Sequence, residues 1–134
     1  MNGVARILVV EDEEGLRKLV ERMLCEAGHE VLLACESANG LRLWQSNEID
    51  LVIADLGLPG RSGLETIIDM RTLEPSLPIV VISGRGQGEL IDLITGAGLM
   101  SSVRIVLKPF GAEELLAAVQ QTLGSPPGDE QSSD

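Results

Sequence analysis

Four short apolar runs of this sequence each lead into side chains that could take part in chemistry. The side chains are two carboxylates, then a third carboxylate, then a hydroxyl and finally an ammonium group. In chain order the residues are Glu11 and Asp12, Asp55, Ser83 with Gly84, and Lys108 with Pro109. If the runs are neighbouring parallel strands, these residues meet at one edge of a sheet, where ligands bind in such folds. The spacing therefore predicts one site built from distant parts of the chain.

Three carboxylates in one place favour a bound cation, because like charges a few ångströms apart raise one another's pKa. Mg²⁺ suits a site with few carboxylates and several waters. Beside such an ion, Asp55 can act as a nucleophile, while the Ser83 hydroxyl and the Lys108 ammonium can hold an incoming anion. This combination indicates a carboxylate that accepts a phosphoryl group.

Each of these residues also has an ordinary structural explanation. An Asp at a strand end commonly caps a helix or forms a turn. Glu11 and Asp12 could form the acidic first turn of a helix, and a lone lysine usually lies in solvent. Because these explanations would have to coincide four times at one edge, the conjunction favours a functional site.

The segments between the apolar runs have helical periodicity. After the first run, apolar residues recur at one helix face as Leu16, Leu19, Val20, Met23, Leu24 and Ala27, and Gly28 is expected to end that helix. The pattern predicts strands at 5–10, 31–35, 51–54, 79–82 and 104–107, and helices at 16–27, 37–47, 64–73, 88–99 and after 109. Five such pairs predict a (βα)5 fold, an α/β protein with a parallel sheet covered on both faces. Cys25 and Cys35 lie in these segments without metal-ligand spacing, and we predict reduced core thiols.

The composition excludes several classes of partner. The formal net charge of −11, from 10 basic and 21 acidic residues, argues against direct binding of nucleic acid or of an anionic membrane. No apolar run approaches the ~20 residues of a membrane-spanning helix, and the first residues do not resemble a signal peptide. We therefore expect a cytoplasmic protein with one domain.

The sequence resembles the receiver domain of bacterial two-component response regulators over residues 5–124. Four motifs carry the resemblance, and their order at the ends of the first, third, fourth and fifth strands makes it specific. They are ILVVEDE (7–13), DLVIADLGLPGRSG (50–63), VVISG (80–84) and LKPF (107–110).

The resemblance implies a flavodoxin-like sheet of strand order 2-1-3-4-5 and phosphorylation of Asp55. It implies Mg²⁺ bound directly by Asp12 and Asp55, mostly through water by Glu11, and by the backbone carbonyl of Gly57. The resemblance also implies that residues around the fourth and fifth strands hold the phosphoryl oxygens and form the conformational switch. These are Ser83, Gly84, Lys108 and the switch-position residue Ile105, with a cis bond before Pro109 aiming the lysine.

Three departures from the family pattern concern signalling. Ile105 stands where the family normally has an aromatic switch residue, and a β-branched aliphatic has a stiff χ1, so we expect a small switch movement. The segment from Gly98 to Lys108 is longer than usual. Gly57 and Arg85 occupy positions that tend to tune phosphate hydrolysis in the family.

Residues 1–124 are thus expected to form a receiver domain, followed by a disordered acidic tail or linker at 125–134. The domain would take its phosphoryl group from a histidine kinase or a phosphotransfer protein, either as a stand-alone regulator or as part of a longer chain. It would be a regulator rather than a metabolic enzyme, catalysing only its own phosphorylation and dephosphorylation. Apolar residues of the 88–99 helix, with the fifth strand and last helix, would dock a downstream protein or a second copy of the chain.

Two alternatives remain at this point. A degenerate receiver would bind partners without being phosphorylated, as an interaction module. An enzyme on the same fold is disfavoured, because a flavodoxin needs aromatic packing and the lone Trp44 lies off the predicted edge. A phosphatase with an Asp-x-Asp pair fails because position 57 is Gly.

Overall fold

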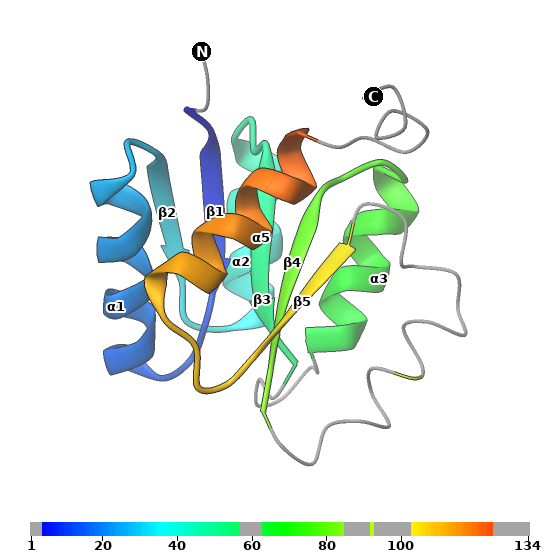
Figure 1. The fold of residues 1–134 in the computed structure, drawn as a ribbon. Coiled ribbons are helices and arrows are strands. Elements are labelled where there is room, and N and C mark those ends of the chain that lie inside the picture. The colour runs from blue at the N-terminus through cyan, green and yellow to red at the C-terminus, as the bar shows by residue number, and fades with distance from the viewer. Residues whose placement is uncertain (1–3, 57–62, 85–91, 93–102, 125–134) are drawn as a thin grey trace.

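The computed structural model describes residues 4–56, 63–84, 92 and 103–124. Within them, five parallel strands form one sheet of order β2-β1-β3-β4-β5, which confirms the predicted fold (Figure 1). The strands are β1 (Arg6–Val10), β2 (Glu30–Ala34), β3 (Leu51–Asp55), β4 (Ile79–Ser83) and β5 (Val103–Leu107). The expected helix at 88–99 and the tail at 125–134 fall outside the described residues, apart from Asp92.

Helices cover both faces of the sheet, as Figure 1 shows. Their bounds are α1 (Glu14–Glu26), α2 (Ser37–Ser46), α3 (Gly63–Leu73) and α5 (Ala112–Gly124). Alternate residues of each strand point to opposite faces, so Ile7 and Val9 pack with α1 and α5. Leu8 and Val10 pack with α2 and α3 instead.

Burial differs between the central and the outer strands. Every residue of β3 and β4 is buried, as are Ile7–Val10 of β1. The outer strands β2 and β5 are only partly buried, and the Leu107 side chain is 60% exposed. The predicted cover on both faces of the sheet is confirmed, and it is most complete over the three central strands.

A glycine ends α1 as predicted. Gly28 has φ +96°, its N–H donates to Cys25 O, and the His29 N–H donates to Leu24 O. These two bonds satisfy the last carbonyls of the helix in the geometry of a Schellman motif, which favours glycine at the left-handed position.

The prediction of core thiols was wrong. Cys25 and Cys35 are free but exposed, because Cys25 lies near the end of α1 away from its buried face and Cys35 follows the last residue of an outer strand. Leu19 is also 43% exposed, whereas its neighbour Val20 is fully buried. The buried stripe of α1 is thus narrower than the periodicity of the sequence predicts.

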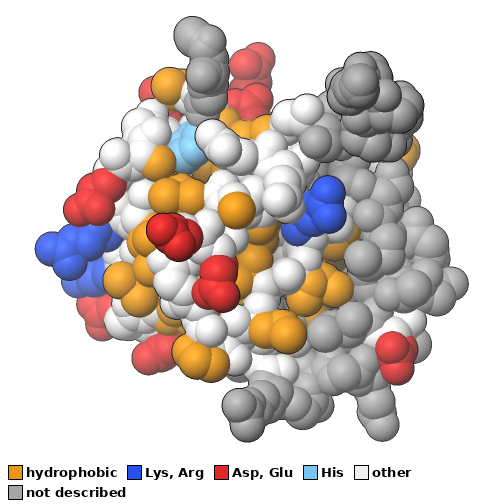
Figure 2. Space-filling model, viewed as in Figure 1, with side chains coloured by type: hydrophobic (Ala, Val, Ile, Leu, Met, Phe, Trp, Pro, Cys, Tyr) orange, Lys and Arg blue, Asp and Glu red, His pale blue; other side chains and the backbone are white. Residues whose placement is uncertain are grey.

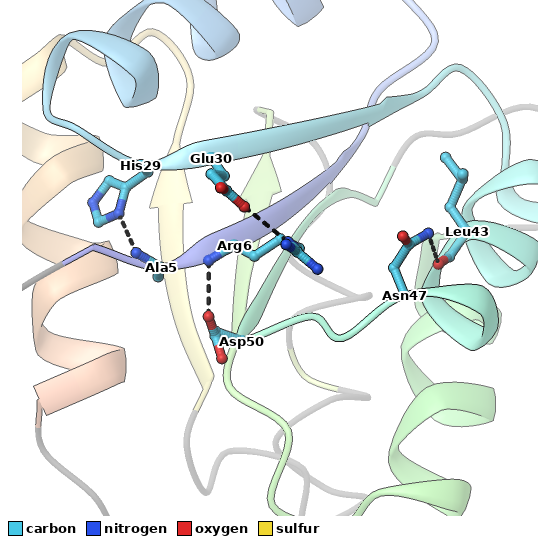
Figure 3. Close-up of polar contacts among 7 residues, drawn as sticks. All are labelled: Ala5, Arg6, His29, Glu30, Leu43, Asn47 and Asp50. Carbon is cyan, nitrogen blue, oxygen red and sulfur yellow. Dashed lines mark hydrogen bonds and ion pairs between the residues drawn. The ribbon is translucent and has the colours of Figure 1, made fainter.

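At the amino edge of the sheet, polar side chains bind the backbone of β1 (Figure 3). The Ala5 N–H donates to His29 Nδ1 over 3.0 Å, and the Arg6 N–H donates to Asp50 Oδ2 over 2.8 Å. Arg6 Nε also bonds Glu30 Oε1 over 2.9 Å. These contacts join the starts of β1, β2 and β3 at the edge opposite the predicted site.

The surface carries charges of both signs, and on α1 they lie next to each other in the pairs Lys18–Glu14 and Arg22–Glu26. In the view of Figure 2, basic and acidic side chains adjoin over α1, while apolar and acidic side chains share the middle of the face. No helix within the described ranges is both long and apolar enough to cross a membrane.

Candidate functional site

The strand register brings the predicted site residues to the carboxyl edge of the sheet. Asp55 pairs with Ile82 in the register of β3 and β4, and Ser83 pairs with Leu107 in that of β4 and β5. Glu11 follows the last residue of β1, and its N–H donates to Ala34 O at the end of β2. The Lys108 N–H donates to Ser83 O over 2.9 Å. Parallel pairing therefore assembles residues that are far apart in the sequence.

Asp55 and Lys108 form an ion pair. Lys108 Nζ lies 2.7 Å from Asp55 Oδ2, and the two side chains are 37% and 4% exposed respectively. Although burial alone lowers the pKa of Lys108, the hydrogen bond and charge of Asp55, with the charges of Glu11 and Glu13, raise that pKa overall. The lysine is therefore cationic and directed at the carboxylate expected to be the nucleophile.

Glu11 is the most unusual group of the site. It is 1% exposed, and its pKa is raised to about 8, first by burial and then by a hydrogen bond with Asp55 and the charge of Asp55. The Glu13 N–H, which donates to Glu11 Oε2 over 3.1 Å, and the charge of Lys108 act in the opposite direction.

Protonation decides how Glu11 and Asp55 interact. Two ionised carboxylates cannot donate to each other, so a hydrogen bond between them requires a proton on one. When Glu11 is ionised, its Oε1 is buried without a donor among the described residues. In the absence of a metal, the raised pKa of Glu11 favours a proton on this carboxyl group, which can then donate to Asp55.

Two further predicted site residues, Ser83 and Ile105, lie on β4 and β5. Ser83 is fully buried, and its Oγ lies 3.4 Å from Gly84 O, which is long for a hydroxyl hydrogen bond. Ile105 pairs with Val81 in the register and is half-buried against the core on the α2 and α3 side. The peptide bond between Lys108 and Pro109 is cis, the form that the family resemblance implied.

An arginine that the sequence analysis missed holds the acidic loop. Arg17 Nη1 donates to Glu11 O over 3.0 Å and to Asp12 O over 3.3 Å. The sequence contains one signal for it: a cation in the first turns of a helix opposes the helix dipole, so an Arg at this place needs another partner.

The site offers hard oxygen ligands that fit Mg²⁺. Glu11 Oε1 is a buried oxygen without a donor in the described part of the chain, and it neighbours the buried Asp55. A cation there would complete the coordination of Glu11. Asp12 is exposed, and no three His, Cys, Asp or Glu side chains within the described ranges converge closely enough to hold a metal by themselves. Gly57, the expected carbonyl ligand, lies outside the described residues.

A parallel α/β sheet whose carboxyl edge holds a buried Asp paired with a half-buried Lys, beside a buried Glu, is typical of a class of phospho-acceptor domain. The chain belongs to the response regulator receiver domain family, whose model matches residues 7–120. Response regulators partner with histidine kinases, and receiver domains generally bind Mg²⁺ for phosphorylation.

Curated relatives are longer than this chain. It is 38% identical over 120 residues to the two-component response regulator PhoP of Pseudomonas aeruginosa, covering 88% of this chain and 51% of PhoP. It is 35% identical over 115 residues to the transcriptional regulatory protein DltR of Streptococcus agalactiae, covering 86% of this chain and 50% of DltR. The chain thus spans about half the length of these relatives.

Solved structures match the fold over nearly the whole chain. A response regulator receiver domain protein from Clostridium thermocellum has a TM-score of 0.80 at 29% identity, covering 90% of this chain and 94% of that one. The chemotaxis response regulator CheY4 of Vibrio cholerae has a TM-score of 0.80 at 27% identity, covering 90% of this chain and all of CheY4.

Proposed function

We propose that Asp55 accepts a phosphoryl group from a histidine kinase or a histidine phosphotransfer protein. The observation that supports this most is the buried Asp55 carboxylate at the end of β3, 2.7 Å from Lys108 Nζ and next to buried Glu11. A structural capping role gives no reason to bury two carboxyl groups together, because burial of charge is unfavourable unless it is compensated.

Mg²⁺ would be held by Asp55, Asp12 and, mostly through water, Glu11, with the Gly57 carbonyl as the ligand that the family pattern implies. When bound, the metal neutralises the acids and shields the developing charge on the phosphoryl oxygens. The side chain of Asp12 is exposed, and the bond from Arg17 to Asp12 O holds the backbone from which that carboxylate would reach the metal.

The chain's own residues then perform the transfer. An Asp55 carboxylate oxygen attacks the phosphorus, a phosphorus–oxygen bond forms, and the bond to the donor atom breaks with its electron pair leaving on the donor. Lys108 moves from the carboxylate to a phosphoryl oxygen, and the Ser83 hydroxyl donates to another. The charge-assisted bond of Lys108 favours the acylphosphate product. We infer that the domain catalyses only this reaction and its hydrolysis.

Mass spectrometry after incubation with Mg²⁺ and acetyl phosphate tests the proposal. The wild type is expected to gain one phosphoryl group, and Asp55→Asn or a chelator should abolish the gain. Asp50→Asn is the matched control, because Asp50 is an aspartate at the opposite edge of the sheet. If folded wild-type protein gains no phosphoryl group from acetyl phosphate or from phosphorylated kinases, the alternative of a degenerate receiver is the better explanation. Such a receiver binds partners without being phosphorylated.

We further propose that residues 1–124 are the receiver and 125–134 a tail or linker. On β5, the Leu107 side chain is 60% exposed, and this apolar exposure supports docking of a downstream protein or a second copy on the predicted face formed by the 88–99 helix, β5 and α5. Leu107→Glu should weaken that association without lowering phosphorylation, and unchanged association would place the partner elsewhere.

A further inference from the structure

We propose that Arg17 is a positioning residue that orients the acidic loop Glu11–Glu13 for a divalent cation. The inference rests on the proposed function, because it concerns the metal that phosphorylation would require. Its basis is the placement of one guanidinium nitrogen between the carbonyl oxygens of two consecutive residues, Glu11 and Asp12.

The basic residues of α1 use their charges differently. Lys18 pairs with Glu14 over 3.1 Å and Arg22 with Glu26 over 3.8 Å, with all four side chains at least 67% exposed. Arg17 is half-buried, and within the described residues it pairs with no carboxylate although Glu13 and Glu14 are close in sequence. Its side chain therefore bonds to the loop backbone in preference to the ion pairs that its neighbours form.

Those bonds complete the fixing of Glu11. Its N–H donates to Ala34 O, its carbonyl accepts from Arg17 and its Oε2 accepts from the Glu13 N–H. Only Oε1 is left without a donor among the described residues. With the other polar groups held, this buried oxygen remains available to a cation, which could bind without first ordering the loop.

Asp12 depends on Arg17 in another way. Its side chain is exposed, so its direction is set by the backbone, and the bond from Arg17 to Asp12 O fixes the peptide that follows it. A guanidinium can donate to two acceptors from a planar group, whereas a lysine ammonium is a point charge on a flexible stem. The arginine geometry, and not only its charge, should therefore matter.

Metal affinity of the folded full chain tests the proposal. Mn²⁺ is the probe, and its free concentration is read from its electron paramagnetic resonance signal. Arg17→Ala is expected to weaken Mn²⁺ binding about tenfold, the low end for residues that orient metal ligands. Arg17→Lys should recover only part of that loss. Lys18→Ala and Arg22→Ala remove exposed cations of the same helix and should leave the affinity within about twofold, as surface charges are largely screened.

Each other outcome overturns the proposal. Unchanged Mn²⁺ affinity in Arg17→Ala, with only a lower melting temperature, would make the role of Arg17 structural. Tighter binding would mean that Arg17 acts mainly by repelling the cation, and equal losses in all three variants would indicate a general charge effect. If Arg17→Ala does not fold, Arg17→Lys carries the comparison, and wild-type affinity in it overturns the proposal.

The same samples separate this inference from the proposed function. If the wild type binds Mn²⁺ but gains no phosphoryl group from acetyl phosphate and Mg²⁺, phosphorylation fails while the role of Arg17 is still decided by the Mn²⁺ affinities. If the wild type is phosphorylated and Arg17→Ala keeps its Mn²⁺ affinity, only the role of Arg17 fails. A wild type that binds no Mn²⁺ overturns both.

Discussion

At the amino edge of the sheet two polar side chains accept from backbone N–H groups, whereas at the carboxyl edge the side chains of Asp55 and Lys108 bind each other. His29 and Asp50 accept from the N–H groups of Ala5 and Arg6 (Figure 3). At the other edge Lys108 bonds Asp55, and Glu11 keeps an oxygen without a donor in the described part of the chain. Both edges are formed by the ends of the same strands, so strand geometry alone does not cause the difference.

The difference separates an edge whose contacts stabilise the fold from an edge whose buried carboxyl groups oppose its stability, as the proposed phosphorylation site would. A side chain that satisfies a backbone N–H removes an unpaired donor and stabilises the fold by a modest amount. Two buried carboxyl groups with one ammonium do the reverse, because their desolvation is compensated only in part. Substitutions at the carboxyl edge should therefore impair function, and one should even stabilise the protein, whereas those at the amino edge should only destabilise it.

Lys108→Ala should have the largest effect on function. It removes the cation that faces Asp55 and would hold a phosphoryl oxygen, so the initial rate of phosphorylation by acetyl phosphate should fall about a hundredfold, as for loss of one donor to developing charge. Mass spectrometry over time measures the rate, with Lys18→Ala as the control. A Lys108→Ala rate within threefold of wild type would remove Lys108 from the mechanism.

Glu11→Gln should change the pH dependence of stability. The pKa of Glu11 is raised from its ordinary 4.5 to about 8, so between these values the folded protein holds a proton that the unfolded chain releases. Without metal, the free energy of unfolding should therefore fall as pH rises from about 4.5 to 8 and then level off. Gln cannot ionise, so the stability of this variant relative to wild type should be greater at pH 8.5 than at pH 5, by about 4 kcal/mol for a shift of this size.

Urea unfolding at several pH values without divalent cations checks this. Glu14→Gln is the matched control, because Glu14 is an exposed carboxylate a few residues away. A pH-independent difference between Glu11→Gln and wild type would mean that Glu11 is ionised in the folded protein, and that the carboxyl edge is less strained than its burial implies.

The carboxyl edge was largely predictable from the sequence. Asp55 and Lys108 stand where apolar runs end, and in a parallel sheet all such ends share one edge, so their meeting follows from the topology. The strand order itself came from the resemblance to a family. The burial of Glu11 and its raised pKa could not be predicted from residue types, because both depend on tertiary distances.

The amino edge and the loop contacts were not predicted, for a physical reason. His29 and Asp50 are single polar residues near turns, and nothing in their spacing indicates which N–H group they accept from. Arg17 likewise has several acidic neighbours in sequence, and only the folded loop shows that it donates to carbonyls instead. Periodicity also misjudged Cys25, since it gives a face of a helix but not the width of its contact.

Asp50→Ala should have a moderate effect, on stability alone. It leaves the Arg6 N–H without its acceptor, which should reduce the free energy of unfolding by about 1 kcal/mol, a typical value for one hydrogen bond. Phosphorylation of Asp55 should keep its wild-type rate, because Asp50 lies at the opposite edge. A slower rate in Asp50→Ala at full folding would show that the two edges are coupled and that their separation into stability and chemistry is wrong.

Glu30→Gln should have the smallest effect on stability, because it removes a contact of the amino edge that does not involve the backbone. The pair of Arg6 and Glu30 joins two side chains that are 41% and 66% exposed, so solvent screens the attraction, and holding two long side chains together opposes it entropically. Unlike Asp50, Glu30 contributes its carboxylate to a side chain and not to a backbone N–H. Its loss therefore leaves no backbone donor unpaired, and the melting temperature of Glu30→Gln should stay closer to that of wild type than the melting temperature of Asp50→Ala does.

Thermal unfolding of both variants at low and at high salt measures this, and the small Glu30→Gln effect should shrink further in high salt. If Glu30→Gln instead destabilised the protein as much as Asp50→Ala, the amino edge would owe its stability to charges as well as to backbone hydrogen bonds. The two edges would then differ in whether their charged groups are fully paired, and not in whether side chains bind the backbone.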